Sequence, residues 1–248
     1  MSSGLITANI SGMNKKPNIL IVEDEEAIRT GLMDVLVFHG FTTDYADEGH
    51  SGLKKALSGH YDLILLDVML PGIDGFEICN RIREEDREQP VIMLTARSSD
   101  EDIIQGLKLG ADDYVSKPFS VAQLVLRIQA VLRRTVTGQE QDNSINLGSD
   151  MSIDTRNMCG QNAQGEVHFT RREIDILQYL YTHSERPVSR DELLNKIWGY
   201  ARDMDLETRT VDIHIAKLRR KIEQQPSKPQ YLVTVRGAGY RLMVENAG

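Results

Sequence analysis

Residues 61–75 read Tyr-Asp-Leu-Ile-Leu-Leu-Asp-Val-Met-Leu-Pro-Gly-Ile-Asp-Gly, an apolar run that leads into a Pro/Gly turn. The unbroken run Leu63–Leu66 is typical of a strand buried on both faces, in a parallel sheet covered by helices. Pro71 and Gly72 then break the strand. Because ligands of open α/β sheets bind beyond the carboxyl ends of the strands, Asp67 is predicted to lie in a functional crevice. Taken alone, Asp67 would be interpreted as an ordinary turn or capping residue.

The sequence around this stretch predicts an α/β fold for the first half of the chain. Strand-like runs alternate with amphipathic stretches such as Ala27–His39 and Val121–Arg134. Such alternation indicates a doubly wound, five-stranded parallel sheet of the flavodoxin-like kind. The predicted strands are Ile19–Val22, Thr42–Tyr45, Leu63–Leu66, Val91–Leu94 and Asp113–Val115.

The chain of 248 residues has room for two domains. We predict a flexible tail at 1–14, a first domain at 15–134, a polar linker at 135–143 and a second domain at 144–248. Residues 1–134 carry 14 basic and 21 acidic side chains, a net charge of −7, whereas the remainder carries −1. The acidity of the whole chain therefore does not exclude a DNA-binding second half.

No apolar run is long enough to span a bilayer, and residues 1–14 lack the pattern of a secretory signal. Cys79 and Cys159 have no partner at metal-binding or redox spacing, so both are interpreted as small hydrophobic residues. These features predict a cytoplasmic protein without a membrane partner.

Polar residues follow four of the predicted strands and could meet at one edge of the sheet. Neighbouring carboxylates repel each other unless a cation lies among them, and oxygen ligands suit Mg²⁺. An ammonium and a hydroxyl beside them match the oxygens of a phosphoryl group, so the pocket predicts acyl-phosphate formation on an Asp. Asp67 is the predicted nucleophile because it stands singly, whereas Glu23 and Asp24 are adjacent. The polar residues are Glu23-Asp24 after the first strand, Asp67 after the third, Thr95 after the fourth and Lys117 after the fifth.

Because of these polar residues at the strand ends, residues 18–134 resemble the receiver domain of bacterial two-component response regulators. The resemblance implies phosphoryl transfer from a phosphohistidine of a sensor histidine kinase to Asp67. It also implies Mg²⁺ held by Asp24, Asp67 and the backbone carbonyl of Met69, with Glu23 acting mostly through a water molecule. A cis peptide bond is implied between Lys117 and Pro118.

The same resemblance implies a switch. A phosphoryl group on Asp67 would draw Thr95 and Lys117 inward, and the Tyr114 ring would turn into the space that Thr95 leaves. The face built from residues 100–110 and Val121–Arg134 would then rearrange and carry the output.

The second half predicts a small antiparallel sheet followed by three helices. Residues 144–169 contain short runs broken by turn residues. Capping patterns begin helices at Thr170-Arg171-Arg172-Glu173 and at Ser189-Arg190-Asp191-Glu192. The third helix, Thr208–Glu223, carries an apolar stripe and five Lys or Arg against two acidic residues. A basic helix of this kind could enter the major groove of DNA, although a solvated charged face is the alternative interpretation.

Residues 231–242 then predict two strands around a Gly-containing turn with Arg236 at its tip. Three helices and a hairpin resemble the winged helix-turn-helix domain of the OmpR/PhoB subfamily. Arg-Thr-Val-Asp-Ile-His-Ile at 209–215 and Thr-Val-Arg-Gly-Ala-Gly-Tyr-Arg at 234–241 carry the resemblance. It implies that the segment Gly199–Glu207 is offered to RNA polymerase and that seven residues contact double-stranded promoter DNA. They are Arg209, Thr210, His214, Lys217, Arg219, Thr234 and Arg236.

Members of this subfamily usually dimerise through charge pairs when phosphorylated. Asp113 and Arg127 retain one such pair, and we hypothesise a weaker or more apolar homodimer in this chain. Uncharged or unmatched residues stand where partners of the other pairs are expected, namely Ile103, Lys108, Gln123 and Gln129.

The sequence thus predicts a phosphorylation-controlled transcription regulator that is no enzyme beyond its own phosphorylation and dephosphorylation. One alternative is a phosphotransferase or phosphatase with an Asp nucleophile. Such an enzyme usually has a second Asp two residues after the nucleophile, where this chain has Met69. Another alternative is a DNA-binding protein with a vestigial receiver. Metal-dependent phosphorylation distinguishes the alternatives.

Overall fold

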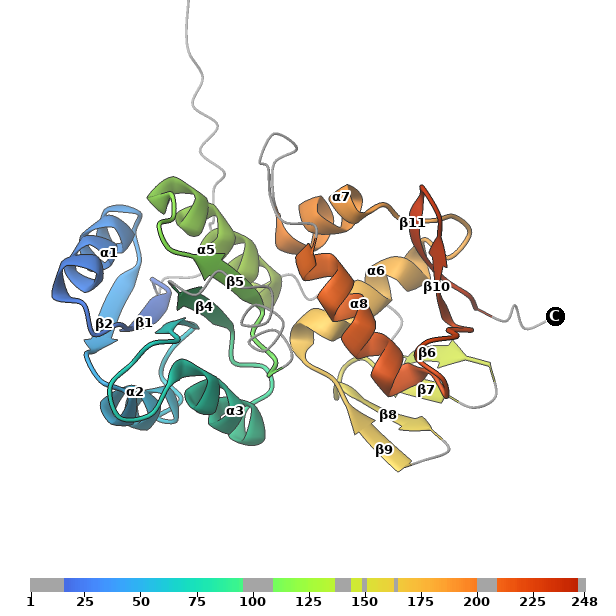
Figure 1. Cartoon of the computed structure of the whole chain (residues 1–248), viewed down its shortest axis with the longest axis horizontal. Helices are drawn as coiled ribbons and strands as arrows, with labels where there is room; N and C mark the ends of the chain where they lie inside the picture. The colour runs from blue at the N-terminus through green and yellow to red at the C-terminus, as the bar shows by residue number, and fades with distance from the viewer. Residues whose placement is uncertain are drawn as a thin grey trace, which may run out of the picture.

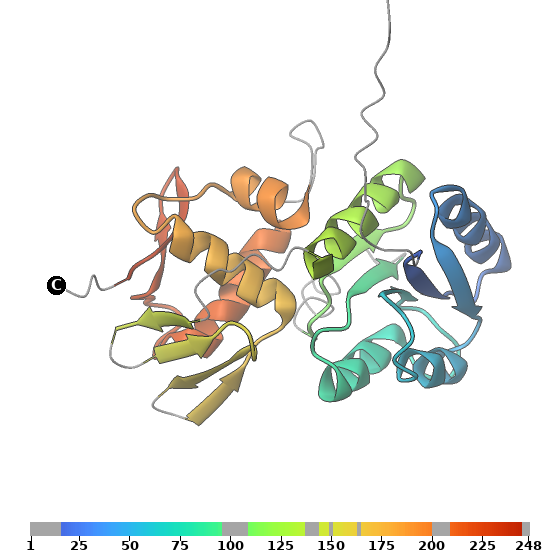
Figure 2. The same ribbon diagram turned by 180° about the vertical axis from the view of Figure 1, so that it is seen from behind.

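The structure is a computed structural model and describes residues 16–95, 109–136, 144–148, 151–162, 165–199 and 209–244. Two lobes lie side by side, one built on a parallel sheet and the other on helices with two small antiparallel sheets (Figures 1 and 2). Within the described part, no helix combines the length and apolar character needed to cross a membrane.

The first lobe contains a five-stranded parallel sheet with the order β2-β1-β3-β4-β5, which confirms the predicted doubly wound fold. Each strand is one residue longer than predicted, so Asp67 and Thr95 are the last residues of their strands. The strands are β1 (Asn18–Val22), β2 (Thr42–Ala46), β3 (Leu63–Asp67), β4 (Val91–Thr95) and β5 (Asp113–Ser116). The helices described in this lobe are α1 (Glu26–Phe38), α2 (Gly49–Ala56), α3 (Gly75–Glu85) and α5 (Val121–Val136).

Alternate residues of the central strands pack on opposite faces of the sheet. Leu63 and Leu65 belong to a core shared with α1 and α5, whereas Ile64 and Leu66 belong to a core shared with α2 and α3. Figures 1 and 2 show the two helix pairs on the two faces. A strand covered on both sides needs apolar residues at every position, which explains the unbroken run that began the prediction.

The second lobe contains a four-stranded antiparallel sheet, helices and a C-terminal hairpin, which confirms the predicted winged-helix architecture. Thr170 and Glu173 form the predicted capping box, and the Ser189 side chain accepts from the Glu192 backbone N–H. The strands are β6 (Ser144–Leu147), β7 (Met151–Asp154), β8 (Cys159–Asn162), β9 (Gly165–His168), β10 (Leu232–Val235) and β11 (Gly239–Leu242). The helices are α6 (Arg171–Thr182), α7 (Arg190–Leu193), the π-helical turn η1 (Leu194–Trp198) and α8 (Arg209–Ile222).

Several sequence predictions fall partly or wholly outside the described residues. The tail 1–14 lies there, as do most of the linker and residues 200–207 of the segment assigned to RNA polymerase. Helix α5 reaches Val136, two residues beyond the predicted end of the first domain. Cys79 is buried and Cys159 is half-buried, both as free thiols.

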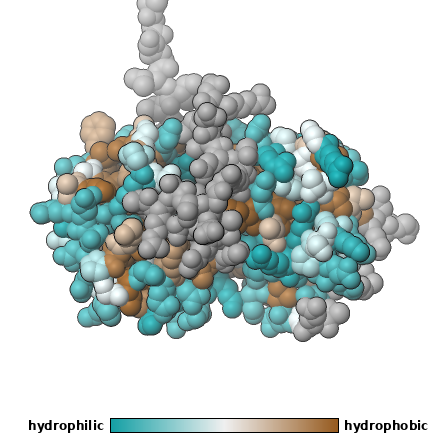
Figure 3. All heavy atoms as spheres, viewed as in Figure 1, coloured by the Kyte–Doolittle hydropathy of each residue, from teal (hydrophilic) through white to brown (hydrophobic). Residues whose placement is uncertain are grey.

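The surface seen in Figure 3 is largely hydrophilic, with apolar patches over both lobes. On α5, Leu126 and Val121 are 47% and 39% exposed. Gln123 and Gln129 are also exposed, so the described outer face of α5 from Val121 to Gln129 is largely uncharged. Such a surface is what the predicted homodimer with few charge pairs would require.

Candidate functional site

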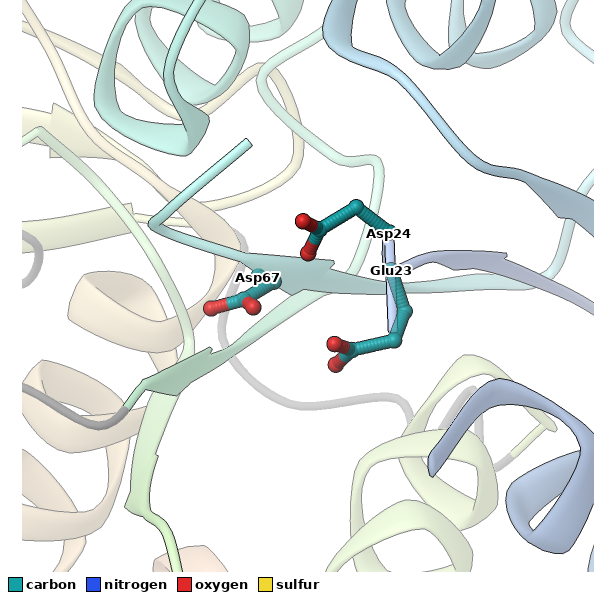
Figure 4. Close-up of side chains that lie close together, drawn as sticks. All are labelled: Glu23, Asp24 and Asp67. Atoms are coloured by element: carbon teal, nitrogen blue, oxygen red, sulfur yellow. The ribbon is translucent and has the colours of Figure 1, made fainter. Parts of the chain in front are cut away.

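Three carboxylates meet at the carboxyl ends of two neighbouring strands (Figure 4). Asp67 ends β3, while Glu23 and Asp24 directly follow β1, which pairs with β3. Oxygen atoms of the three side chains lie within 4.8 Å of one another. Glu23 and Asp67 are buried, whereas Asp24 is exposed. The parallel register therefore brings together residues 43 positions apart in the sequence.

Lys117, which follows β5, closes the group from the other side of the sheet. Its ammonium donates to Asp67 Oδ2 over 2.8 Å and to Glu23 Oε1 over 2.9 Å, and Glu23 Oε2 is 2.7 Å away. The Lys117–Pro118 peptide bond is cis, as the resemblance implies. The structure thus brings Glu23, Asp24, Asp67 and Lys117 together, as the sequence predicts.

Burial and mutual charge control the ionisation of this group. Burial raises the pKa of Glu23, as does the charge of Asp67, although the hydrogen bond from Lys117 opposes both effects. Burial disfavours the charged Lys117, but hydrogen bonds to Asp67 and Glu23 outweigh it and raise the pKa of Lys117. The single positive charge of Lys117 does not neutralise the three carboxylates of Glu23, Asp24 and Asp67. The remaining negative charge and the hard oxygen donors fit a divalent cation such as Mg²⁺.

The turn after β3 fixes the direction of the Asp67 side chain. The Met69 backbone N–H donates to Asp67 Oδ1 over 3.2 Å, while the Met69 side chain is exposed. Gly72 adopts φ 87°, a left-handed conformation that favours glycine. Gly75 donates its N–H to the Val68 carbonyl over 3.0 Å and begins α3 directly against the Asp67 backbone.

The two predicted switch residues lie on adjacent strands. Thr95 ends β4 opposite Ser116 of β5, but its side chain lies outside the described residues. The Tyr114 ring is buried in the core shared with α2 and α3. The geometry relating the Thr95 hydroxyl to the Tyr114 ring therefore stays a prediction.

The charge pair predicted for the dimer face, Asp113 and Arg127, forms an ion pair within one chain. Arg127 of α5 donates to Asp113 Oδ2 of β5 over 2.9 Å, and both side chains are largely buried. Ile103 and Lys108 lie outside the described residues.

Helix α8 buries the predicted apolar stripe but also buries three predicted DNA contacts. Thr210, His214 and Lys217 are only 6%, 0% and 8% exposed, so they do not lie on a free surface here. The apolar stripe consists of Val211, Ile215, Leu218 and Ile222.

Two cations of α8, the buried Lys217 and the half-buried Lys221, are held by their own domain. Lys217 and Lys221 lie 3.4 Å and 2.6 Å from the carboxylate of Glu173, which also closes the capping box of α6. Burial and the positive charges of Lys217 and Arg172 hold the pKa of His214 well below its usual range. The sequence marks Glu173 as a capping residue, but its second role depends on packing.

The wing is the hairpin of β10 and β11; its turn is exposed, and β10 is bonded to α8. Arg219 donates to the Leu232 carbonyl and to Thr234 Oγ1, each over 2.8 Å. Thr234 and Arg236 are exposed, and Gly237 beside Arg236 adopts φ 75° in the turn. The Arg209 side chain lies outside the described residues.

Comparison with known families agrees with both halves of the structure. Residues 19–129 match the response regulator receiver domain, and residues 164–242 match the C-terminal domain of transcriptional regulatory proteins. This chain belongs to the transcriptional response regulators. The predicted family, a two-component response regulator of the OmpR/PhoB type, is confirmed.

This response regulator resembles its relatives over nearly its whole length. PhoP of Bacillus subtilis strain 168, an alkaline phosphatase synthesis transcriptional regulatory protein, is 41% identical over 238 residues, covering 93% of this chain and 97% of PhoP. The response regulator ArlR of Staphylococcus haemolyticus strain JCSC1435 is 43% identical over 224 residues, covering 90% and 98%. A solved structure of a RitR mutant aligns with a TM-score of 0.66 at 27% identity, covering 92% of this chain and 99% of that one.

Proposed function

We propose that this response regulator accepts a phosphoryl group on Asp67 from a sensor histidine kinase, then dimerises and binds promoter DNA. The observation that carries the proposal is the single carboxylate of Asp67, hydrogen-bonded to Lys117 and beside Glu23 and Asp24. In the transfer, an Asp67 oxygen forms the new bond to phosphorus while the bond from phosphorus to the histidine nitrogen breaks. The imidazole leaves with the electron pair of that bond.

The surrounding residues have distinct roles in this step. The Lys117 ammonium lies where it would neutralise oxygens of the incoming phosphoryl group. Glu23, Asp24, Asp67 and the Met69 carbonyl would hold Mg²⁺, which supplies further charge neutralisation when bound. Thr95 would bond a phosphoryl oxygen and release space near Tyr114.

Phosphorylation is expected to increase the mass of the chain in solution to that of a dimer. The exposed apolar Val121 and Leu126 of α5 support an interface with few charge pairs. Analytical ultracentrifugation in the presence of Mg²⁺, with and without the phosphoryl mimic beryllofluoride, measures this change in mass. Leu126→Glu should remain monomeric under both conditions while still accepting label. An unchanged mass of the wild-type chain would contradict phosphorylation-driven dimerisation.

DNA binding is assigned to α8 and to the wing, and RNA polymerase is proposed to contact the segment Gly199–Glu207. Arg236→Ala should weaken binding and reduce the slope of log affinity against log salt by about 1, as loss of one phosphate contact does. Affinity is measured on a duplex recovered by mapping bound genomic DNA. Lys228→Ala is the control, because exposed Lys228 precedes β10 and lies at the opposite end of the hairpin from its tip. Equal affinity of the Arg236→Ala variant and the wild type would contradict a contact between Arg236 and DNA.

A further inference from the structure

The Arg29 side chain of α1 reaches back to the two acidic residues that follow β1. Its Nη1 donates to the Glu23 carbonyl over 2.9 Å and to the Asp24 carbonyl over 3.0 Å. A single nitrogen therefore bridges the backbone of both residues. Figure 4 shows the Glu23 and Asp24 side chains leaving neighbouring positions of the chain in different directions. Rotation of this short backbone segment would move both carboxylates relative to Asp67.

Arg29 holds this segment where a helix cap would ordinarily do so. A side-chain cap usually fixes the chain at the point where it enters a helix. The N-cap residue of α1 is Glu25, which makes no side-chain capping hydrogen bond. Glu23 is also held from β2, because its N–H donates to the Ala46 carbonyl over 3.0 Å. Asp24 is exposed, so the hydrogen bond from Arg29 is an important restraint on its position.

The stability of the helix does not explain a cation at this position. Arg29 is the fourth residue of α1, and the partial positive charge at the N-terminal end of a helix disfavours a cation nearby. The side chain is nevertheless half-buried and directed towards the start of the helix. Its hydrogen bonds therefore relate Arg29 to the carboxylate pocket rather than to the helix.

A second contact holds the guanidinium in place. The Arg29 Cζ lies over the Tyr45 ring, 5.0 Å from the ring centroid, which is within the range of a cation–π interaction. Lys55 in turn fixes Tyr45, because it donates to the Tyr45 carbonyl over 2.7 Å and lies 5.6 Å from the same ring. Lys55 also pairs with Asp44 over 2.7 Å. Residues of β2 and α2 thus support the Arg29 side chain.

We propose that Arg29 is a positioning residue for the divalent cation that the three carboxylates would hold. By fixing the carbonyls of Glu23 and Asp24, it keeps both carboxylates at the spacing that the cation requires. Arg29 acts through the backbone, because both hydrogen bonds end on main-chain oxygens. The inference rests on the proposed role of the pocket in binding Mg²⁺. Loss of a group that orients metal ligands typically lowers metal affinity by about 10–100-fold.

The charge of Arg29 and its hydrogen bonds have opposite effects on a bound cation. A guanidinium repels a divalent cation, so charge alone predicts tighter metal binding when Arg29 is replaced by a neutral residue. Loss of the two hydrogen bonds frees the carboxylates and predicts weaker binding. The direction of the change in affinity therefore distinguishes a positioning role from a purely electrostatic one.

Mn²⁺ is the probe, because it takes the same oxygen ligands as Mg²⁺ and electron paramagnetic resonance measures its unbound fraction. In the full chain without phosphodonor, Arg29→Met should bind Mn²⁺ about tenfold more weakly than the wild type. Arg29→Lys retains the charge and one nitrogen donor, so its affinity should lie closer to that of the wild type. Tyr45→Ala changes no charge and leaves α1 intact, and it should weaken binding by a smaller factor than Arg29→Met.

Lys54→Met is the matched control. Lys54 is exposed in the last turn of α2, at the end of that helix remote from the carboxyl edge of the sheet. Its replacement removes one positive charge and should leave Mn²⁺ affinity unchanged. Amide hydrogen exchange without metal gives a second readout, because exchange at residues 23–25 should rise in Arg29→Met and stay at the wild-type rate in Lys54→Met.

The outcomes separate this inference from the proposed function. Wild-type or tighter Mn²⁺ affinity of Arg29→Met would overturn the positioning role and leave the metal site in place. Wild-type exchange at residues 23–25 of the same variant would also overturn it. A wild-type chain that binds no Mn²⁺ would overturn the metal site itself, and the positioning role with it. Because phosphodonor is absent, failure of Asp67 as the acceptor would not affect these measurements.

Discussion

Asp67→Asn is expected to eliminate the acid-labile label that a small phosphodonor leaves on the wild-type chain. An amide has nearly the shape of the carboxylate and still accepts a hydrogen bond from Lys117, but it is not a nucleophile at neutral pH. The fold should therefore survive while the chemistry is lost. Intact-protein mass spectrometry before and after acid treatment measures the label, and circular dichroism checks the fold.

Two controls give this result its meaning. Asp34→Asn changes an exposed carboxylate of α1 and should label like the wild type. Chelation of divalent cations should prevent labelling of the wild-type chain, because three carboxylates and one ammonium leave negative charge that repels a phosphodonor. Label that persists on the Asp67→Asn variant would assign the nucleophile to another carboxylate. Label formed equally well under chelation would contradict the metal requirement.

Gly75→Ala is expected to damage both the fold and the acceptor site. A Cβ at this position would overlap the Asp67 carbonyl oxygen and lie 2.9 Å from Val68 Cα, and both obstacles are backbone. Relief of the clash must displace either the start of α3 or the end of β3. Overpacking of this kind costs about 1–3 kcal/mol of unfolding free energy. Because the displaced backbone carries Asp67, the proposed nucleophile, the labelling rate should decrease as well.

Gly31→Ala is the matched control in the same lobe. Gly31 lies inside α1, and an added Cβ meets no atom within 4 Å among the described residues. Alanine in an exposed helix interior stabilises by roughly 0.5–1 kcal/mol relative to glycine. Chemical denaturation should therefore shift in opposite directions for the two variants, with the labelling rate unchanged in Gly31→Ala. Wild-type stability and labelling of Gly75→Ala would show that the β3–α3 junction is not constrained.

The cluster of three carboxylates and Lys117 was predictable because parallel strands impose a simple geometry. The carboxyl ends of all five strands lie at one edge of the sheet, so residues that follow different strands must come close together. This is why Glu23, Asp24, Asp67 and Lys117 could be grouped before their positions were known. The one-residue errors at the strand ends did not matter, because each polar group still lies at that edge.

The exposure of α8, the helix predicted to read DNA, was not predictable by the same means. Helical periodicity distinguishes the stripe of α8 that meets its own core from the other faces, but it does not identify what covers those faces. His214 and Lys217 lie off the stripe and were predicted to face DNA, yet both are buried within the second lobe. Their burial depends on packing against Glu173 and Trp198, residues from other helices.

The sequence by itself determined the two domains, the edge of the sheet where Asp67 lies and the basic character of α8, because each follows from local pattern and strand direction. Only the tertiary structure decided that Ile213 rests on the receiver core and that Trp198 donates to Asp112. Those contacts join residues 86 positions or more apart through side-chain packing and one backbone carbonyl. Neither leaves a periodic signal in the sequence, because each depends on the relative orientation of two separately folded lobes.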